Sequence, residues 1–125
     1  MAFYIVLERE IEGLDMEIDG KALSRANDSL EELARNLGVR PLLEFFSLSP
    51  ESSRDFMEGE GIDANEFELP PLQQFSAEEG LRTIRALMGY DGDGREQVLK
   101  DLQQCEVVLT AAQQNSIGWH LEIDI

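Results

Sequence analysis

The chain has few of the residues that most enzymes use, with one histidine and one cysteine among its 125 residues. Recognisable nucleophilic and metal sites draw mainly on these two residue types. Cys105 cannot form an internal disulfide, and because Glu106 follows it we interpret it as a small buried side chain rather than a reactive thiol. No motif fixes a reaction, so we expect no cofactor and no metal, and a non-enzymatic role is favoured.

Basic residues are also scarce, since 10 Lys and Arg stand against 26 Asp and Glu, for a net charge of −16. Binding of phosphates needs clustered Lys and Arg, so the sequence argues against nucleic acid and against an anionic membrane surface. No apolar run approaches the roughly 20 residues of a membrane span. Residues 1–7 are apolar, but no basic stretch precedes them and acids follow at once, which predicts no signal peptide and a cytoplasmic protein.

What the chain does have is an ordinary hydrophobic fraction of 42% and a length suited to a single domain over residues 1–125. The negative charge is concentrated in three segments, residues 1–20, 51–70 and 91–125. If these segments meet on one face, they form an acidic surface for a cationic partner; if they are spread out, they form a solvated shell.

Three segments have strand patterns. Residues 3–8 are rich in β-branched and aromatic residues, and residues 14–18 alternate apolar with acidic side chains. Residues 117–125 alternate most clearly, which predicts a C-terminal strand paired with the N-terminal one.

Helical spacing fills much of the remainder. It predicts an amphipathic helix over 23–37 stopped by Gly38, and short helices after Pro41 and after Ser49-Pro50. Residues 59–74 suggest an ordered loop. Ser76 with Glu79 forms a capping box for a helix to Met88, and Asp93 with Glu96 suggests a second cap before a helix through Ala112. The predicted fold is α+β: a small β-sheet including the N- and C-terminal strands, packed on one face by about four helices.

Candidate sites are weak. Residues 91–94 (DGDG) resemble the start of a calcium loop, but Arg95, Glu96 and Leu102 occupy positions that need other residues, so we interpret them as a turn. His120 lies on the polar side of its strand without a nucleophile motif elsewhere, and we expect it to be exposed or half-buried. Trp119 fits the core better than a ligand platform, although such a ring can anchor an interface.

Two further groups are candidates for binding. Arg82 and Arg85 share a helical face, where they could bind an anion but more simply form ion pairs with Glu78, Glu79 or the acidic segments. The central acidic segment could bind a hard cation weakly, although a linear cluster does not show convergence. Its candidate residues are Glu58, Glu60, Asp63 and Glu66.

Three stretches are similar to a set of small acidic bacterial proteins of unknown function: GKALSRA at 20–26, LGVRPLLEFFS at 37–47 and AEEGLRTIRAL at 77–87. The resemblance implies a bacterial, cytoplasmic, single-domain protein. It brings no activity and no catalytic residues.

The leading hypothesis is a protein-interaction module, such as an acidic inhibitor or immunity-type protein for a basic partner. A second hypothesis is a small-molecule binder or a carboxylate- and arginine-based enzyme, with a site near residues 56–85. A third is a homo-oligomer whose sheet edges pair between subunits.

Overall fold

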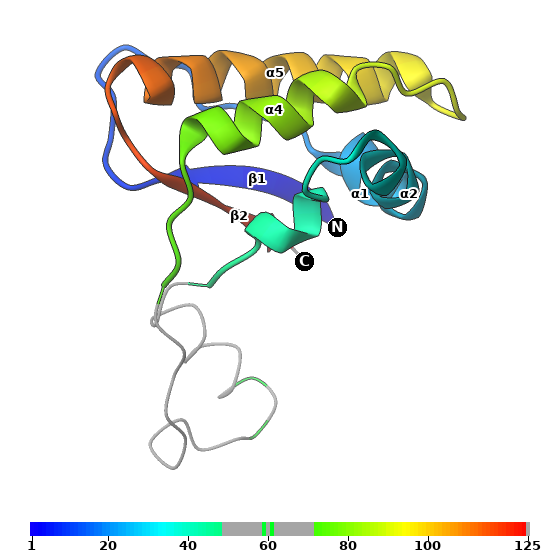
Figure 1. Cartoon of the computed structure of the whole chain (residues 1–125). Helices are drawn as coiled ribbons and strands as arrows, with labels where there is room; N and C mark the ends of the chain where they lie inside the picture. Colours follow the sequence, from blue (N-terminus) through cyan, green and yellow to red (C-terminus); the bar gives the residue numbers. More distant parts are fainter. Residues whose placement is uncertain (49–58, 60, 62–71, 125) are drawn as a thin grey trace.

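A computed structural model describes residues 1–48, 59, 61 and 72–124 of the chain. The elements in order are β1 (Ala2–Leu7), α1 (Lys21–Arg25), α2 (Asn27–Leu37), the 3₁₀ helix η1 (Leu42–Phe45), α4 (Ala77–Leu87), α5 (Arg95–Gln114) and β2 (Trp119–Asp124). Figure 1 shows α4 and α5 side by side over the two strands, with α1 and α2 beside the start of β1. The predicted α+β fold is confirmed.

The sheet consists of the two predicted terminal strands, β1 and β2, paired antiparallel. Ile5 faces Leu121 and Leu7 faces Trp119 in this register. Side chains alternate between the faces of a strand, so these residues share one face. That face belongs to the main core cluster, together with the buried sides of α4 and α5.

β2 has neighbours on both edges. Beyond β1, Phe75 and Trp119 exchange two backbone hydrogen bonds of 2.8 and 3.0 Å, and the N–H of Ser47 donates to the carbonyl of Leu121 at 3.1 Å. These contacts make β2 a central strand with neighbours on both edges, whereas β1 is an edge strand.

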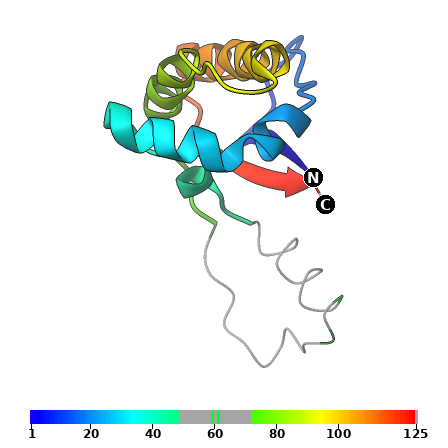
Figure 2. The same cartoon turned by 90° about the vertical axis from the view of Figure 1, so that its right-hand side faces the viewer.

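Two predictions about the first forty residues need correction. Residues 14–18 form an extended loop, not a strand. Leu14 and Ile18 pack against the core while Met16 is exposed, so the alternation is real, but no neighbouring strand completes a ladder. The single helix predicted over 23–37 is two helices, α1 and α2, which meet at Ala26 with a bend that Figure 2 shows from the side.

The helix ends agree with the predictions in part. Gly38 ends α2 in the left-handed conformation, and the Ser76 hydroxyl accepts a hydrogen bond of 3.1 Å from the Glu79 N–H at the start of α4. The cap predicted at Asp93 is wrong, because α5 begins after Gly94 and has no side-chain cap. The helix predicted after Ser49-Pro50 and most of the 59–74 loop lie outside the described residues.

The core of α5 matches its predicted stripe, since Val98, Leu102, Cys105, Leu109 and Ala112 are all buried. Burial of Cys105, and secondarily the nearby Asp101 carboxylate, raises the pKa of its thiol to about 12. The thiol therefore stays protonated at neutral pH, which supports a packing role for Cys105.

Candidate functional site

The only histidine lies in a buried polar pair on β2. His120 Nε2 is 2.7 Å from Glu122 Oε2, and the two residues are 1% and 7% exposed. The Tyr4 hydroxyl donates to Glu122 Oε1 at 3.4 Å from the opposite strand, and burial together with the Glu122 carboxylate raises the pKa of Tyr4. The expectation that His120 would be exposed or half-buried is wrong. His120 and Glu122 lie two residues apart on one face of β2 and pair there, a contact that the alternation of the strand does not reveal.

In the described part of the chain, the side chains of this pair form hydrogen bonds only with each other and with Tyr4. His120 Nδ1 has no hydrogen-bond partner in the described part of the chain, and neither His120 nor Glu122 lines any of the hollows described below. Within residues 1–48 and 72–124, no group of three His, Cys, Asp or Glu side chains is arranged to hold a metal ion. The arrangement fits a buried strand pair in which Glu122 supplies the partner of His120 Nε2.

Trp119 belongs to the core, as its sequence position suggested. Its ring is 1% exposed and stacks on Phe45 with centroids 4.8 Å apart, while Phe75 meets Phe45 edge-on at 5.2 Å. The indole N–H donates to the carbonyl of Ser76 at 3.1 Å. The Arg40 guanidinium lies 5.5 Å from the Phe45 ring centre, which closes this aromatic cluster on one side.

The two candidate arginines of α4 lie together, as predicted, and line a hollow of about 410 Å³. Arg85 Nε donates to Glu106 Oε2 of α5 at 3.1 Å, an ion pair with the C-terminal acidic segment. Arg82 forms no ion pair with any residue that the structure describes. The acids proposed to complete a site here, Glu58, Glu60, Asp63 and Glu66, lie outside the described residues.

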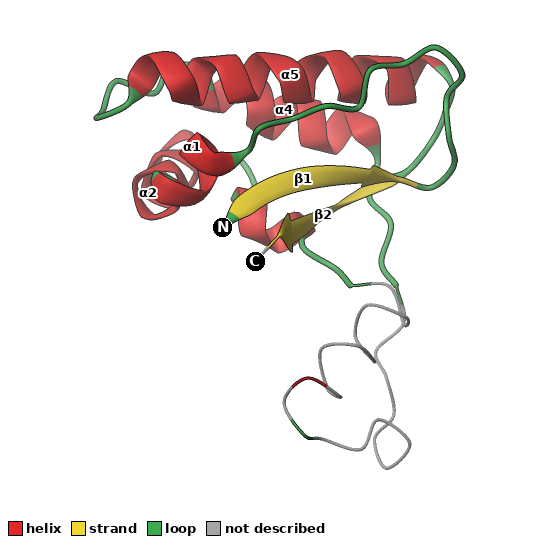
Figure 3. Cartoon of the chain, turned by 180° about the vertical axis from the view of Figure 1, so that it is seen from behind, coloured by secondary structure: helices red, strands yellow, loops and turns green. Residues whose placement is uncertain are grey.

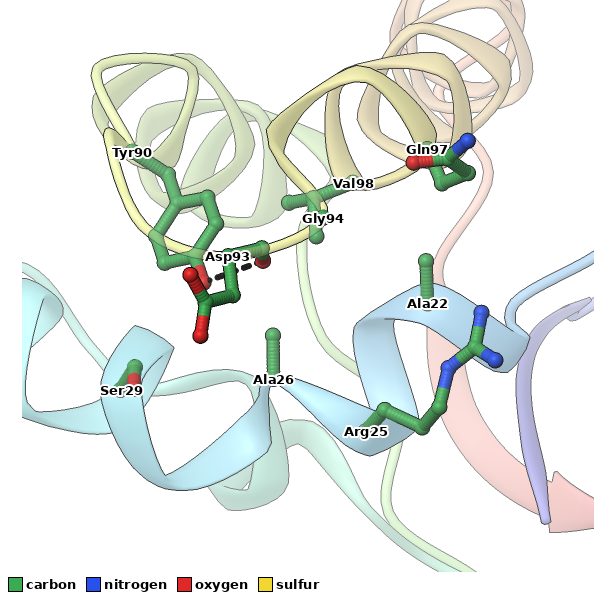
Figure 4. Close-up of a pocket in the computed structure, with 9 residues that line it drawn as sticks. All are labelled: Ala22, Arg25, Ala26, Ser29, Tyr90, Asp93, Gly94, Gln97 and Val98. Atoms are coloured by element: carbon green, nitrogen blue, oxygen red, sulfur yellow. Dashed lines mark hydrogen bonds between the residues drawn. The ribbon is translucent and has the colours of Figure 1, made fainter.

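The DGDG stretch is a turn between α4 and α5, as interpreted from the sequence. The Tyr90 hydroxyl donates to the Asp93 carbonyl at 2.8 Å and closes the turn. A hollow of about 350 Å³ lies beside it, with Arg25 and Ser29 from α1 and α2 on one side and Gln97 from α5 on the other (Figure 4). Arg25 is exposed and Asp93 is nearby, so the hollow carries charges of both signs and no evident ligand specificity.

The largest of these hollows was not predicted. A groove of about 810 Å³ separates β1 from the following segment, residues 9–16, and we call it the β1 groove. Figure 3 shows this segment leaving the end of β1 and crossing in front of α5 to reach α1. Apolar side chains line much of it: Val6, Leu7, Ile11, Leu14 and Met16.

The rim of the β1 groove is acidic at Glu10 and Glu12, which line it, and further acids precede and follow them in the same segment. Residues 8–19 contain six carboxylates, all exposed. None forms an ion pair with a base in the part of the chain that the structure describes, and Arg9, the one base of this segment, donates to the carbonyl of Asn115 at 3.3 Å. The six carboxylates are Glu8, Glu10, Glu12, Asp15, Glu17 and Asp19. The acid alternation was visible in the sequence, but the groove depends on the path of residues 9–16.

A buried carboxylate on α5 binds the start of α1, which follows this segment in the chain. Asp101, 3% exposed, accepts hydrogen bonds from the backbone N–H groups of Ala22 at 3.1 Å and Leu23 at 3.3 Å. Gly20 is the N-cap residue of α1 and has no side chain to accept these hydrogen bonds, so Asp101 caps the helix instead. Burial raises the pKa of Asp101, against the lowering effect of these hydrogen bonds.

We expect Asp101→Asn to reveal this raised pKa as a pH-dependent stability difference. Asparagine keeps an oxygen acceptor for both N–H groups but cannot ionise. Because the folded pKa lies above the unfolded one, the wild type loses free energy of unfolding relative to Asp101→Asn as pH rises through the folded pKa. Urea unfolding of both proteins at a series of pH values measures the difference.

Asp101→Ala serves as the control for the cap itself. Relative to Asp101→Asn, removal of the acceptor should cost about 1 kcal/mol at every pH, because neither variant ionises at this position. A wild type that gains stability over Asp101→Asn as pH rises would contradict the role of burial.

Comparisons with known proteins give no relative: no family model matches the chain, and neither does any curated protein or solved structure. Among the described residues, none of the helices combines the length and the apolar character needed to cross a membrane. The fold and the composition define the protein as a small acidic α+β domain.

Proposed function

We propose that the protein is a non-enzymatic interaction module that binds a basic partner protein through the β1 groove. One observation carries the proposal: a groove of about 810 Å³ has an apolar lining and a rim of exposed carboxylates. Apolar contact supplies affinity at such a surface, and the charged rim selects the partner and its orientation.

The net charge of the whole chain also favours binding of a basic partner. A net charge of −16 attracts a cationic protein over distances beyond contact and raises its association rate. Salt screens such attraction, with a Debye length of about 8 Å at physiological ionic strength. An inhibitor or immunity-type protein for a basic enzyme would use charge in this way.

The residues best suited to chemistry support a non-enzymatic role. His120 is paired with Glu122 in the interior, Trp119 is packed under α4, and the Cys105 thiol stays protonated at neutral pH. Each of these side chains has a packing role, and none lines the β1 groove.

Charge reversal at the rim tests this proposal. Wild-type protein immobilised in a bacterial lysate should retain basic proteins at about 50 mM salt and release them at about 500 mM. The double variant Glu10→Lys, Glu12→Lys should retain less than about a tenth as much, because each rim charge changes binding by up to about 1 kcal/mol. Quantitative mass spectrometry of the retained proteins gives the measurement.

The matched control is Asp28→Lys, Glu32→Lys on α2, which changes the net charge equally at two exposed acids away from the groove. It should retain nearly as much as the wild type. Equal losses in the two double variants, or no basic protein bound at either salt, would refute the proposed function.

A further inference from the structure

The outer edge of β1 is unpaired at Ile5 and Leu7 within the described residues. In an antiparallel ladder, alternate residues direct their backbone groups to opposite sides of the strand. The Phe3 N–H donates to the Gly20 carbonyl at 3.0 Å, away from β2, while the Glu8 N–H donates to Gly118 at 2.9 Å in line with the β2 ladder. Ile5 and Leu7 therefore direct their N–H and C=O groups to the same outer side as Phe3.

In the part of the chain that the structure describes, the outward groups of Ile5 and Leu7 have no hydrogen-bond partner. No hydrogen bond joins the backbone of Ile5 or Leu7 to any residue beyond β2 within residues 1–48 and 72–124. The outer edge of β2 differs, because Phe75 and Ser47 occupy it. Each unpaired N–H and C=O in a sheet edge is a template for another strand.

The β1 groove follows this edge. Its lining includes Tyr4 and Val6 from one face of β1, Ile5 and Leu7 from the other, and the segment 9–16 opposite them. A chain lying in the groove would thus meet backbone groups along its length and apolar side chains on both sides.

We propose that an extended segment of the basic partner adds to β1 as a further strand. This inference rests on the proposed function and specifies how the partner binds. In such strand addition, main-chain hydrogen bonds give affinity and alternate side chains give specificity. Here alternate apolar residues would contact Val6 and Leu14, and the intervening Lys or Arg residues would meet Glu10 and Glu12.

The acidic rim selects this occupant over a second copy of the chain. Pairing two β1 edges would bring two sets of carboxylates from residues 8–19 together. Like charges placed opposite each other destabilise strand pairs. A strand that carries lysine or arginine would instead attract these carboxylates.

Amide hydrogen exchange with a defined peptide tests strand addition. The probe is a synthetic peptide of alternating lysine and valine, added to the full chain. It should slow exchange at the Ile5 and Leu7 amides at least about tenfold, because those N–H groups become hydrogen-bonded. The Tyr4 and Val6 amides, which face β2, should change little.

Two control peptides separate charge from strand pairing. Alternating glutamate and valine should not bind, and the lysine–valine peptide with N-methylated backbone amides should bind more weakly and protect Ile5 and Leu7 less, because it cannot form the strand ladder. The double variant Glu10→Lys, Glu12→Lys should reduce the protection by about tenfold.

The possible failures are distinguishable. Binding of the peptide without protection at Ile5 and Leu7 overturns strand addition and leaves the proposed function standing. Absence of peptide binding overturns strand addition, and the lysate experiment then decides the proposed function separately. Protection of these amides in the protein alone that rises with its concentration would show self-pairing and also overturn the inference.

Discussion

Replacing Gly20 with alanine should destabilise the protein by about 3 kcal/mol or more, a large part of a typical total stability of roughly 5–15 kcal/mol. Gly20 has φ +70°, and a Cβ there would lie 2.8 Å from both the backbone N and C of Phe3. The new atom would disturb the hydrogen bond from Phe3 to Gly20 and with it the attachment of β1 to the start of α1. Urea unfolding followed by circular dichroism measures the loss.

Gly13→Ala is the matched control for this variant. Gly13 also has a positive φ, +79°, but a Cβ there meets nothing within 4 Å. It should cost only the left-handed backbone term, about 1–2 kcal/mol. Equal effects of the two variants would show that the close approach to Phe3 contributes nothing.

Gly80→Ala should destabilise the protein by about 2–3 kcal/mol, although alanine favours a helix by up to about 1 kcal/mol. Gly80 lies in α4 directly over the indole, where a Cβ would be 2.6 Å from Cε2 and 2.7 Å from Nε1 of Trp119. The ring would have to move, which weakens its hydrogen bond to Ser76 and its stacking on Phe45.

Tryptophan fluorescence reports this change directly, since Trp119 is the only tryptophan. Gly89→Ala is the control, because the nearest atom to a Cβ there is the Ala86 carbonyl oxygen at 3.6 Å. That variant should stay within about 1 kcal/mol of the wild type, with unchanged emission. A Gly80→Ala protein as stable as the wild type, with the same emission, would contradict the packing described for α4 and β2.

The sequence predicted best those elements whose apolar residues recur with the period of the buried face. The stripe from Val98 to Ala112 appears as a helix because one face of α5 packs on the core, and the terminal strands pair as their alternation indicated. The cap at Ser76 was equally local, since it involves a side chain and an N–H three residues apart.

The failures concern features that depend on distant parts of the chain. Residues 14–18 alternate like a strand, but a ladder needs a neighbour, and nothing local says whether one is present. His120 was expected near the surface because its neighbours alternate, yet it is buried beside Glu122, and no local pattern shows that this face of β2 is covered. Asp101 caps a helix about 80 positions earlier in the chain, a contact that no local pattern could indicate.

The candidate site shows the same division. The exposed acids of residues 8–19 were evident from composition, while the apolar groove beside them required the path of the chain. Arg82 and Arg85 share a hollow as their spacing predicted, but the ion pair of Arg85 with Glu106 needed α4 and α5 to be placed.

The pairing of β1 with β2 also has a consequence during synthesis. Leu7 pairs with Trp119, which is synthesised roughly 110 residues later. At typical translation rates, β1 therefore lacks its partner strand for roughly 5–20 seconds. An apolar strand left alone for that time is prone to aggregate with other nascent chains. The run of carboxylates directly after β1 acts as a gatekeeper, because its charge repels another copy of the same segment while the ribosome completes the chain.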